Sequence, residues 1–215
     1  MSGVPELTAP AVAGGGAGRP AVAAGSPAAA SDTGSSLEWR APFVLDLPRT
    51  LGVHARGRGD PAYQVTPDGY IWRTALTPEG PGTLRVAPAR PALAGSAAEP
   101  ASVTVVRAAA WGPGAAWLLR ELPGMLGADD DRAGFTPAHP LLRELSARHP
   151  GVRVGRSGRV LEALVPAVLE QKVVGAEARL AWRYLLLKFG DPAPGPAPAG
   201  MRVSPPPWTW RRIPS

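Results

Sequence analysis

The chain has 215 residues with a formal net charge of +6, and it contains 26 glycines, 27 prolines and no cysteine. The lack of cysteine excludes disulfides, thiolate metal sites and cysteine nucleophiles, and no apolar run approaches the ~18 residues of a membrane-spanning helix. The N-terminus has no basic start followed by a compact apolar stretch, as a secretory signal would, so we expect a cytoplasmic protein.

Positive charge is concentrated toward the C-terminus. Residues 141–215 carry 12 basic and 5 acidic side chains, whereas residues 1–140 carry 11 basic and 12 acidic ones. Lysine and arginine neutralise phosphates and release counterions, so this distribution favours a polyanionic partner for the last third of the chain. A solvated basic helix surface would produce the same pattern.

The N-terminal part divides into a tail and a predicted sheet. Residues 1–36 are mostly Ala, Gly, Ser and Pro, which bury too little surface to offset ordering entropy and predict a disordered tail. Residues 37–125 predict an antiparallel sheet domain with a terminal helix. The segments 67–69 (Pro-Asp-Gly) and 78–82 (Pro-Glu-Gly-Pro-Gly) separate runs typical of hairpin strands, and residues 101–112 predict a further strand.

Helical patterns follow in chain order. Pro113 suits the first turn of a helix over AAWLLREL, and Pro123-Gly124 is expected to stop it. Thr136 is expected to cap a helix containing PLLRELSARH, and Ser157 the helix after it. The acidic run 129–131 predicts a solvated loop, because a metal site requires more widely distributed oxygen ligands.

Two further helices, over 158–171 and 176–189, form the start of a helical core that spans 126–190. Pro166 should kink the first helix, and Gly190 is placed to follow the second as its C′ residue. Residues 191–215 predict a proline-rich linker. Trp182 is expected in the core, whereas Trp208 and Trp210 could either pack on the core or stack on bases.

The segment LEALVPAVLEQKVV, with GPGAAWLLRELPGMLGADDD and HPLLRELSARHPGVRV before it, resembles the helix-hairpin-helix superfamily of DNA glycosylases. The resemblance covers roughly residues 37–215 and is to the 3-methyladenine type. It implies an α+β fold in which an antiparallel sheet domain precedes the first helices of an all-α core. It also implies base-excision repair, in which an alkylated purine is flipped out of double-stranded DNA and its N-glycosidic bond is hydrolysed.

The resemblance further implies which residues bind DNA. Gln171 and Lys172 match the loop that enters the minor groove at the lesion, and Arg179 and Arg183 follow on the next helix as DNA-binding residues. The family pattern has an apolar wedge after the glutamine, where this chain has Lys172. That lysine could fill the gap, contact a phosphate or base edge, or form a polar turn exposed to water.

The family's catalytic elements, a Leu-Pro-Gly-x-Gly hairpin and an aspartate further along, have no counterpart here. Residues 122–127 (Leu-Pro-Gly-Met-Leu-Gly) have one residue too many between the glycines, and no aspartate lies between Asp131 and Asp191. We therefore assign no catalytic residue, metal ligand or cofactor, and expect the N-terminal part of a glycosylase that is inactive alone. Two alternatives stay open: a non-catalytic DNA-binding module, or a protein whose exposed helical faces a protein partner covers.

Overall fold

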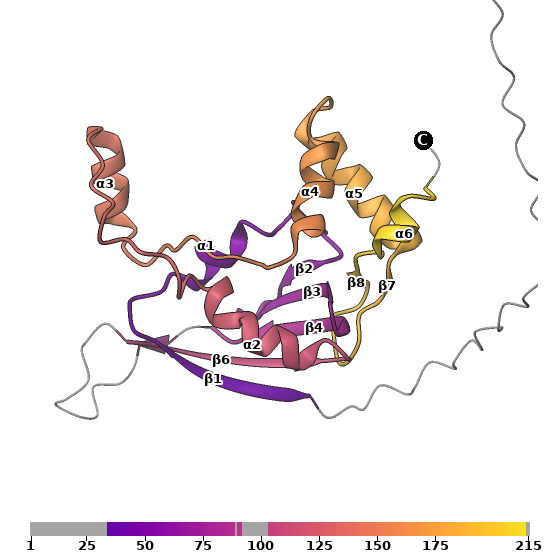
Figure 1. Ribbon diagram of the computed structural model, residues 1–215, viewed down its shortest axis with the longest axis horizontal. Coiled ribbons are helices and arrows are strands. Elements are labelled where there is room, and N and C mark those ends of the chain that lie inside the picture. The colour runs from indigo at the N-terminus through magenta and orange to yellow at the C-terminus, as the bar shows by residue number, and fades with distance from the viewer. Residues whose placement is uncertain (1–33, 89, 92–102, 214–215) are drawn as a thin grey trace, which may run out of the picture.

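The computed structural model describes residues 34–88, 90–91 and 103–213 and has an α+β fold, as predicted (Figure 1). Most of the predicted tail, residues 1–33, lies outside the described residues. Ser35 and Ser36, which we had assigned to that tail, instead begin the first strand. They do so because their backbones pair with Ala110 and Ala109 of a later strand, a contact that local composition does not indicate.

One antiparallel sheet forms the base of the molecule. Its strands, in spatial order, are β1 (Ser35–Ala41), β6 (Thr104–Trp111), β4 (Gly80–Val86), β3 (Ile71–Thr77) and β2 (Tyr63–Val65), and β5 (Arg90–Pro91) pairs with β6. The two predicted turns join neighbouring strands. Gly69, with φ of 83°, lies in the β2–β3 turn, and Gly80, with φ of 120°, ends the β3–β4 turn. Both conformations lie in the left-handed region that favours glycine.

The main core lies between one face of the sheet and two helices, α1 (Leu47–Gly52) and α2 (Ala115–Met125). Helix α2 lies along the sheet, as Figure 1 shows, and places Leu118, Leu122 and Met125 at 0% exposure. Full burial of one such side chain stabilises the fold by about 1.5–3 kcal/mol. Leu84 of β4 and Val106 of β6 meet them from the sheet.

The end of α2 differs from the prediction, since Pro123 lies inside the helix and does not stop it. Proline removes one backbone bond, but the last turn carries Met125 into the core, and this packing outweighs that loss. The helix ends at Met125, and Gly127, with φ of 83°, follows the C-cap Leu126 as the C′ residue. The amide of Gly127 donates to Gly124 O and that of Ala128 to Pro123 O, the pair of bonds that defines a Schellman motif.

The other face of the sheet is covered by the proline-rich segment that follows the last long helix. Strands β7 (Asp191–Pro192) and β8 (Arg202–Val203) pair with each other, and Arg202 N donates to Pro61 O at 2.8 Å. Trp72 and Trp111 stack with ring centroids 5.6 Å apart, and buried Met201 packs on them. Side chains alternate between the two faces of a strand, so these residues form a second, smaller core.

The remaining helices are α3 (Pro140–Arg148), α4 (Val160–Leu169), α5 (Gly175–Phe189) and the short α6 (Pro207–Trp210). Pro166 lies inside α4, as predicted. Two of the predicted caps are wrong. His139, not Thr136, caps α3, because its Nδ1 accepts from Leu141 N at 3.2 Å. Ser157 Oγ accepts from Arg159 N, ahead of the first residue of α4.

Gly190 ends α5 for a reason other than the one predicted. Its φ of −82° is open to any residue, so no left-handed conformation is needed. A Cβ atom here would lie 2.5 Å from Leu186 O and 2.6 Å from Val203 O. Glycine is required because the chain passes this closely between helix and β8. Among the described residues, no helix combines the length and apolarity needed to cross a membrane.

Candidate nucleic-acid interface

The turn between α4 and α5 is exposed and carries the two residues predicted to enter the minor groove. Gln171 and Lys172 are both exposed, and Gln171 Nε2 donates to Ala167 O at 3.3 Å. In Figure 1 this turn lies at the end of the α4–α5 pair that is remote from the sheet. Val173 and Val174 beside it are 45% and 65% exposed. Sequence reasoning overlooked these apolar side chains, although they directly follow Lys172.

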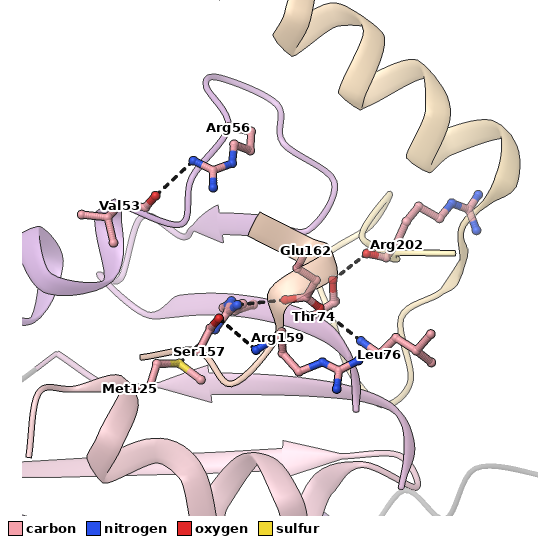
Figure 2. Close-up of polar contacts among 10 residues, drawn as sticks. Val53, Arg56, Thr74, Leu76, Met125, Ser157, Arg159, Glu162 and Arg202 are labelled. Atoms are coloured by element: carbon pink, nitrogen blue, oxygen red, sulfur yellow. Dashed lines mark hydrogen bonds and ion pairs between the residues drawn. The ribbon is translucent and has the colours of Figure 1, made fainter. Parts of the chain in front are cut away.

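A buried ion pair fixes α4 to the sheet. Glu162, in the first turn of α4, accepts from Arg73 Nη2 on β3 at 3.0 Å and from Leu76 N at 3.3 Å (Figure 2). The Arg73 and Glu162 side chains are only 7% and 15% exposed. Arg73 Nη1 also approaches Met125 Sδ at 3.1 Å, which ties the pair to the main core. These contacts hold the start of α4 in a defined orientation.

The protonation of Glu162 reflects two opposing effects. Burial raises the pKa of the Glu162 carboxyl, while the positive charges of Arg73 and Arg159 act to lower it. A buried pair of this kind costs desolvation energy that its mutual attraction must offset. Its defined geometry therefore suits it to positioning α4. The carboxylate already accepts from two donors and lies away from the exposed turn.

A second buried carboxylate fixes α5. Trp182, 4% exposed and in the core as predicted, donates from Nε1 to Asp60 Oδ1 at 3.0 Å. Asp60 also accepts from the backbone amides of Arg56 and Ala62. Trp210 stacks on Trp182 with centroids 6.2 Å apart. The sequence left open whether the C-terminal tryptophans pack on the core or stack on bases, and Trp210 packs on the core. Trp208 is 63% exposed.

The solvent-facing side of α5 carries Arg179 and Arg183, and both lie against the loop before β2. The side chain of Arg179 contacts Gly57, and that of Arg183 contacts Gly59. No hydrogen bond or ion pair joins either arginine to the α4–α5 turn in the described chain. The loop, residues 55–60, adds Arg56 and Arg58, which sequence reasoning missed. The alternation Arg-Gly-Arg-Gly was the available signal, but nothing in the sequence placed it beside α5.

A polar cavity of about 220 Å³ lies where α4, α5 and the sheet meet. Its lining includes His54, Arg56, Arg73, Glu162 and Trp182. The Nε2 atom of His54 is buried and has no hydrogen-bond partner among the described residues. Burial, with smaller contributions from Arg73 and Arg56, lowers the His54 pKa from 6.5 to about 3. The imidazole is therefore neutral at physiological pH.

The acidic run at residues 129–131 has local structural contacts. Asp129 pairs with Arg156 at 2.8 Å, Asp130 accepts from Val154 N at 3.0 Å, and Asp131 accepts from Ala133 N at 2.9 Å. Each carboxylate thus serves a different neighbour. No group of acidic or histidine side chains within the described ranges is arranged to hold a metal ion.

Comparison with known proteins shows a likeness in fold. No protein-family model and no curated protein matches the sequence. Among solved structures, the chain is similar to a 3-methyladenine DNA-glycosylase from Archaeoglobus fulgidus, with a TM-score of 0.52 and 16% sequence identity. The match covers 78% of this chain and 54% of the other, so the chain spans about half the length of that structure.

Proposed function

We propose that this chain binds double-stranded DNA as a glycosylase-like protein of base-excision repair. The observation that carries the proposal is the α4–α5 turn, which projects from two rigidly anchored helices in a glycosylase-like fold. Gln171 and Lys172 would occupy the minor groove at a damaged site. Arg179 and Arg183 would contact backbone phosphates, which position a protein on duplex DNA without reading its sequence.

The shape of the turn supports insertion between bases. Minor-groove proteins that kink DNA commonly use an apolar side chain as a wedge, and Val173 and Val174 supply exposed apolar groups beside Lys172. In this proposal a valine fills the gap and Lys172 contacts a phosphate or base edge. Extruding a base costs a few kcal/mol, and least at a site that is already damaged. The chain should therefore prefer damaged or abasic duplex.

Hydrolysis of an alkylated purine needs a carboxylate to support the positive charge developing on the sugar. In the part of the chain that the structure describes, the buried carboxylates Glu162 and Asp60 are each engaged by hydrogen-bond donors that anchor a helix. Neither lies at the exposed turn. We therefore propose that this chain alone binds DNA without releasing a base.

Binding can be measured by fluorescence anisotropy with three matched duplexes: intact, abasic and alkylated. We expect tighter binding to the abasic duplex and a marked loss of affinity for Arg179→Ala/Arg183→Ala. The control is Arg148→Ala, whose guanidinium pairs with Glu144 on α3. Failure of the wild-type chain to bind any duplex would overturn the proposal. Base release from the alkylated duplex would overturn the non-catalytic part alone.

The apolar surface of α3 favours a second candidate function, association with a helical segment of a protein partner. Leu141, Leu142 and Leu145 are 53%, 48% and 38% exposed, and α3 has no buried residue. Contiguous exposed apolar surface commonly marks an interaction site. Light scattering coupled to size exclusion tests this. Self-association that Leu142→Glu/Leu145→Glu abolishes would identify a second copy of the chain as that partner. A monomeric wild-type chain would exclude a second copy as the partner.

A further inference from the structure

The loop at residues 55–60 has an unusual construction, in which arginine and glycine alternate before a buried aspartate. Gly57 and Gly59 have φ of 85° and 74°, in the left-handed region that side chains with a Cβ rarely adopt. Asp60 Oδ2 accepts from Arg56 N at 2.7 Å, and Asp60 Oδ1 accepts from Ala62 N at 2.9 Å. The carboxylate therefore holds the loop in one folded conformation.

The same carboxylate attaches the loop to α5. Asp60 Oδ1 accepts from Trp182 Nε1 at 3.0 Å, and Asp60 is only 2% exposed. Residues four apart lie on one face of a helix, so Arg179 and Arg183 are neighbours. Trp182, next to Arg183 in sequence, anchors the helix on the loop.

The two glycines bring the loop backbone against these arginines. A Cβ atom at Gly57 would lie 2.6 Å from Arg179 Cδ, and one at Gly59 would lie 3.2 Å from Arg183 Nη1. The spacing of the contacts matches the helix repeat, because successive glycines two residues apart meet successive turns of α5. Any residue larger than glycine at position 57 would displace Arg179.

The arrangement gathers guanidinium groups without neutralising them. Arg58, Arg179 and Arg183 are exposed, and Arg56 is half-buried. Arg56 Nη1 donates to Val53 O at 3.2 Å (Figure 2). In the described part of the chain, none of these four side chains forms an ion pair. The one carboxylate of the loop, Asp60, is buried and already accepts from the donors described above.

Two exposed arginines elsewhere on the sheet domain do form ion pairs. Arg107 pairs with Glu38 at 2.8 Å and Arg120 with Glu79 at 2.9 Å. In both pairs an acidic neighbour on the sheet domain offsets the charge of the arginine. The loop and α5 together leave an excess of positive charge that favours binding of an external anion.

We infer that the loop 55–60 and the exposed face of α5 form one composite site for the phosphodiester backbone of nucleic acid. The planar guanidinium presents paired donors that match phosphate oxygens. Of these four arginines, only Arg56 also lines the neighbouring cavity. The site is therefore an open surface, which suits a nucleic-acid strand and not a small enclosed anion. This inference rests on the proposed function and extends the DNA contact from the helices to the sheet domain.

The test compares loop and helix variants by the salt dependence of binding to an abasic duplex. Each phosphate contact contributes about 0.9 to the slope of log K against log salt concentration. Arg56→Ala/Arg58→Ala should therefore lower the slope by about 1.8, as should Arg179→Ala/Arg183→Ala. The control Arg107→Ala, on the sheet domain but paired with Glu38, should leave both affinity and slope unchanged.

A glycine variant tests whether the two halves act together. Gly57→Ala keeps every charge but forces the loop away from Arg179, so we expect weaker binding to the abasic duplex. Circular dichroism melting of each variant establishes that it is folded. If the loop variant retains wild-type affinity and slope while the α5 variant loses them, the composite site is overturned and the proposed function stands. If the wild-type chain binds no duplex, both are overturned.

Discussion

Because the folded chain keeps His54 neutral while the unfolded chain binds a proton there, the fold should lose stability at a pH well above that at which surface carboxylates titrate. The His54 pKa is lowered from 6.5 to about 3, first by burial and then by Arg73 and Arg56, although the carboxylates Asp60 and Glu162 line the same cavity. A depressed folded-state pKa means that the unfolded chain binds the proton more readily. The associated stability is therefore full above the unfolded pKa and is lost as the pH falls toward the folded one.

The magnitude follows from linkage. Between about pH 7.5 and about pH 5, a histidine with these two pKa values costs about 2 kcal/mol of the free energy of unfolding. Because the folded pKa lies below both conditions, a folded pKa higher by about one unit would change this loss by less than about 0.1 kcal/mol. The expected loss thus depends on His54 being buried and neutral, and hardly on how far its pKa is lowered.

Urea unfolding followed by tryptophan fluorescence at the two pH values measures this loss. The variant His54→Gln, which keeps a neutral polar side chain, should remove about 2 kcal/mol of the pH dependence shown by the wild-type chain. The matched control His149→Gln, at the C-terminal end of α3 and outside the cavity, should retain most of it. Equal acid losses in wild type and His54→Gln would refute the reasoning.

Three further predictions concern the anchors of the helices, and each is checked by urea unfolding. Glu162→Ala should lower the free energy of unfolding by about 3–5 kcal/mol, because it leaves the Arg73 charge buried and unpaired. The double variant Arg73→Met/Glu162→Leu should lower it much less, and equal losses in the two variants would contradict this. Gly190→Ala should cost about 1–3 kcal/mol, since its Cβ would overlap two backbone carbonyl oxygens, and an unchanged midpoint would count against it. Asp60→Asn should lower the free energy of unfolding by about 1–3 kcal/mol for each donor left unsatisfied. It should also increase quenching of Trp182 fluorescence by solvent, and unaltered quenching would argue against the Asp60 anchor.

Local sequence patterns predicted the elements best at turns, where the backbone conformation favours one residue type. The glycines of the two hairpin turns are examples, because the φ of +83° at Gly69 and of +120° at Gly80 lies in the region that glycine adopts without steric cost. The prediction failed at Pro123 and Thr136. At Pro123, packing of the last turn of α2 prevails over a weak local preference, and at Thr136 a competing cap, His139, lies three residues closer to the helix.

Only part of the candidate site was predicted from the sequence. The exposed turn with Gln171 and Lys172, and Arg179 and Arg183 beyond it, were chosen from a resemblance to a family, and their roles in DNA binding stay predictions. Arg58 was not chosen. Its significance depends on a contact between a loop and a helix more than one hundred residues later in the chain, and no local pattern encodes that distance.

The sequence by itself determined the α+β order of elements, the turns and the concentration of positive charge toward the C-terminus. Only the tertiary structure decided which charges meet. Arg73 and Glu162, 89 residues apart, are joined within the interior, whereas the arginines of the loop and α5 form no ion pair with any described residue. Backbone preferences act over a few residues, while burial and ion pairing depend on neighbours brought together by packing.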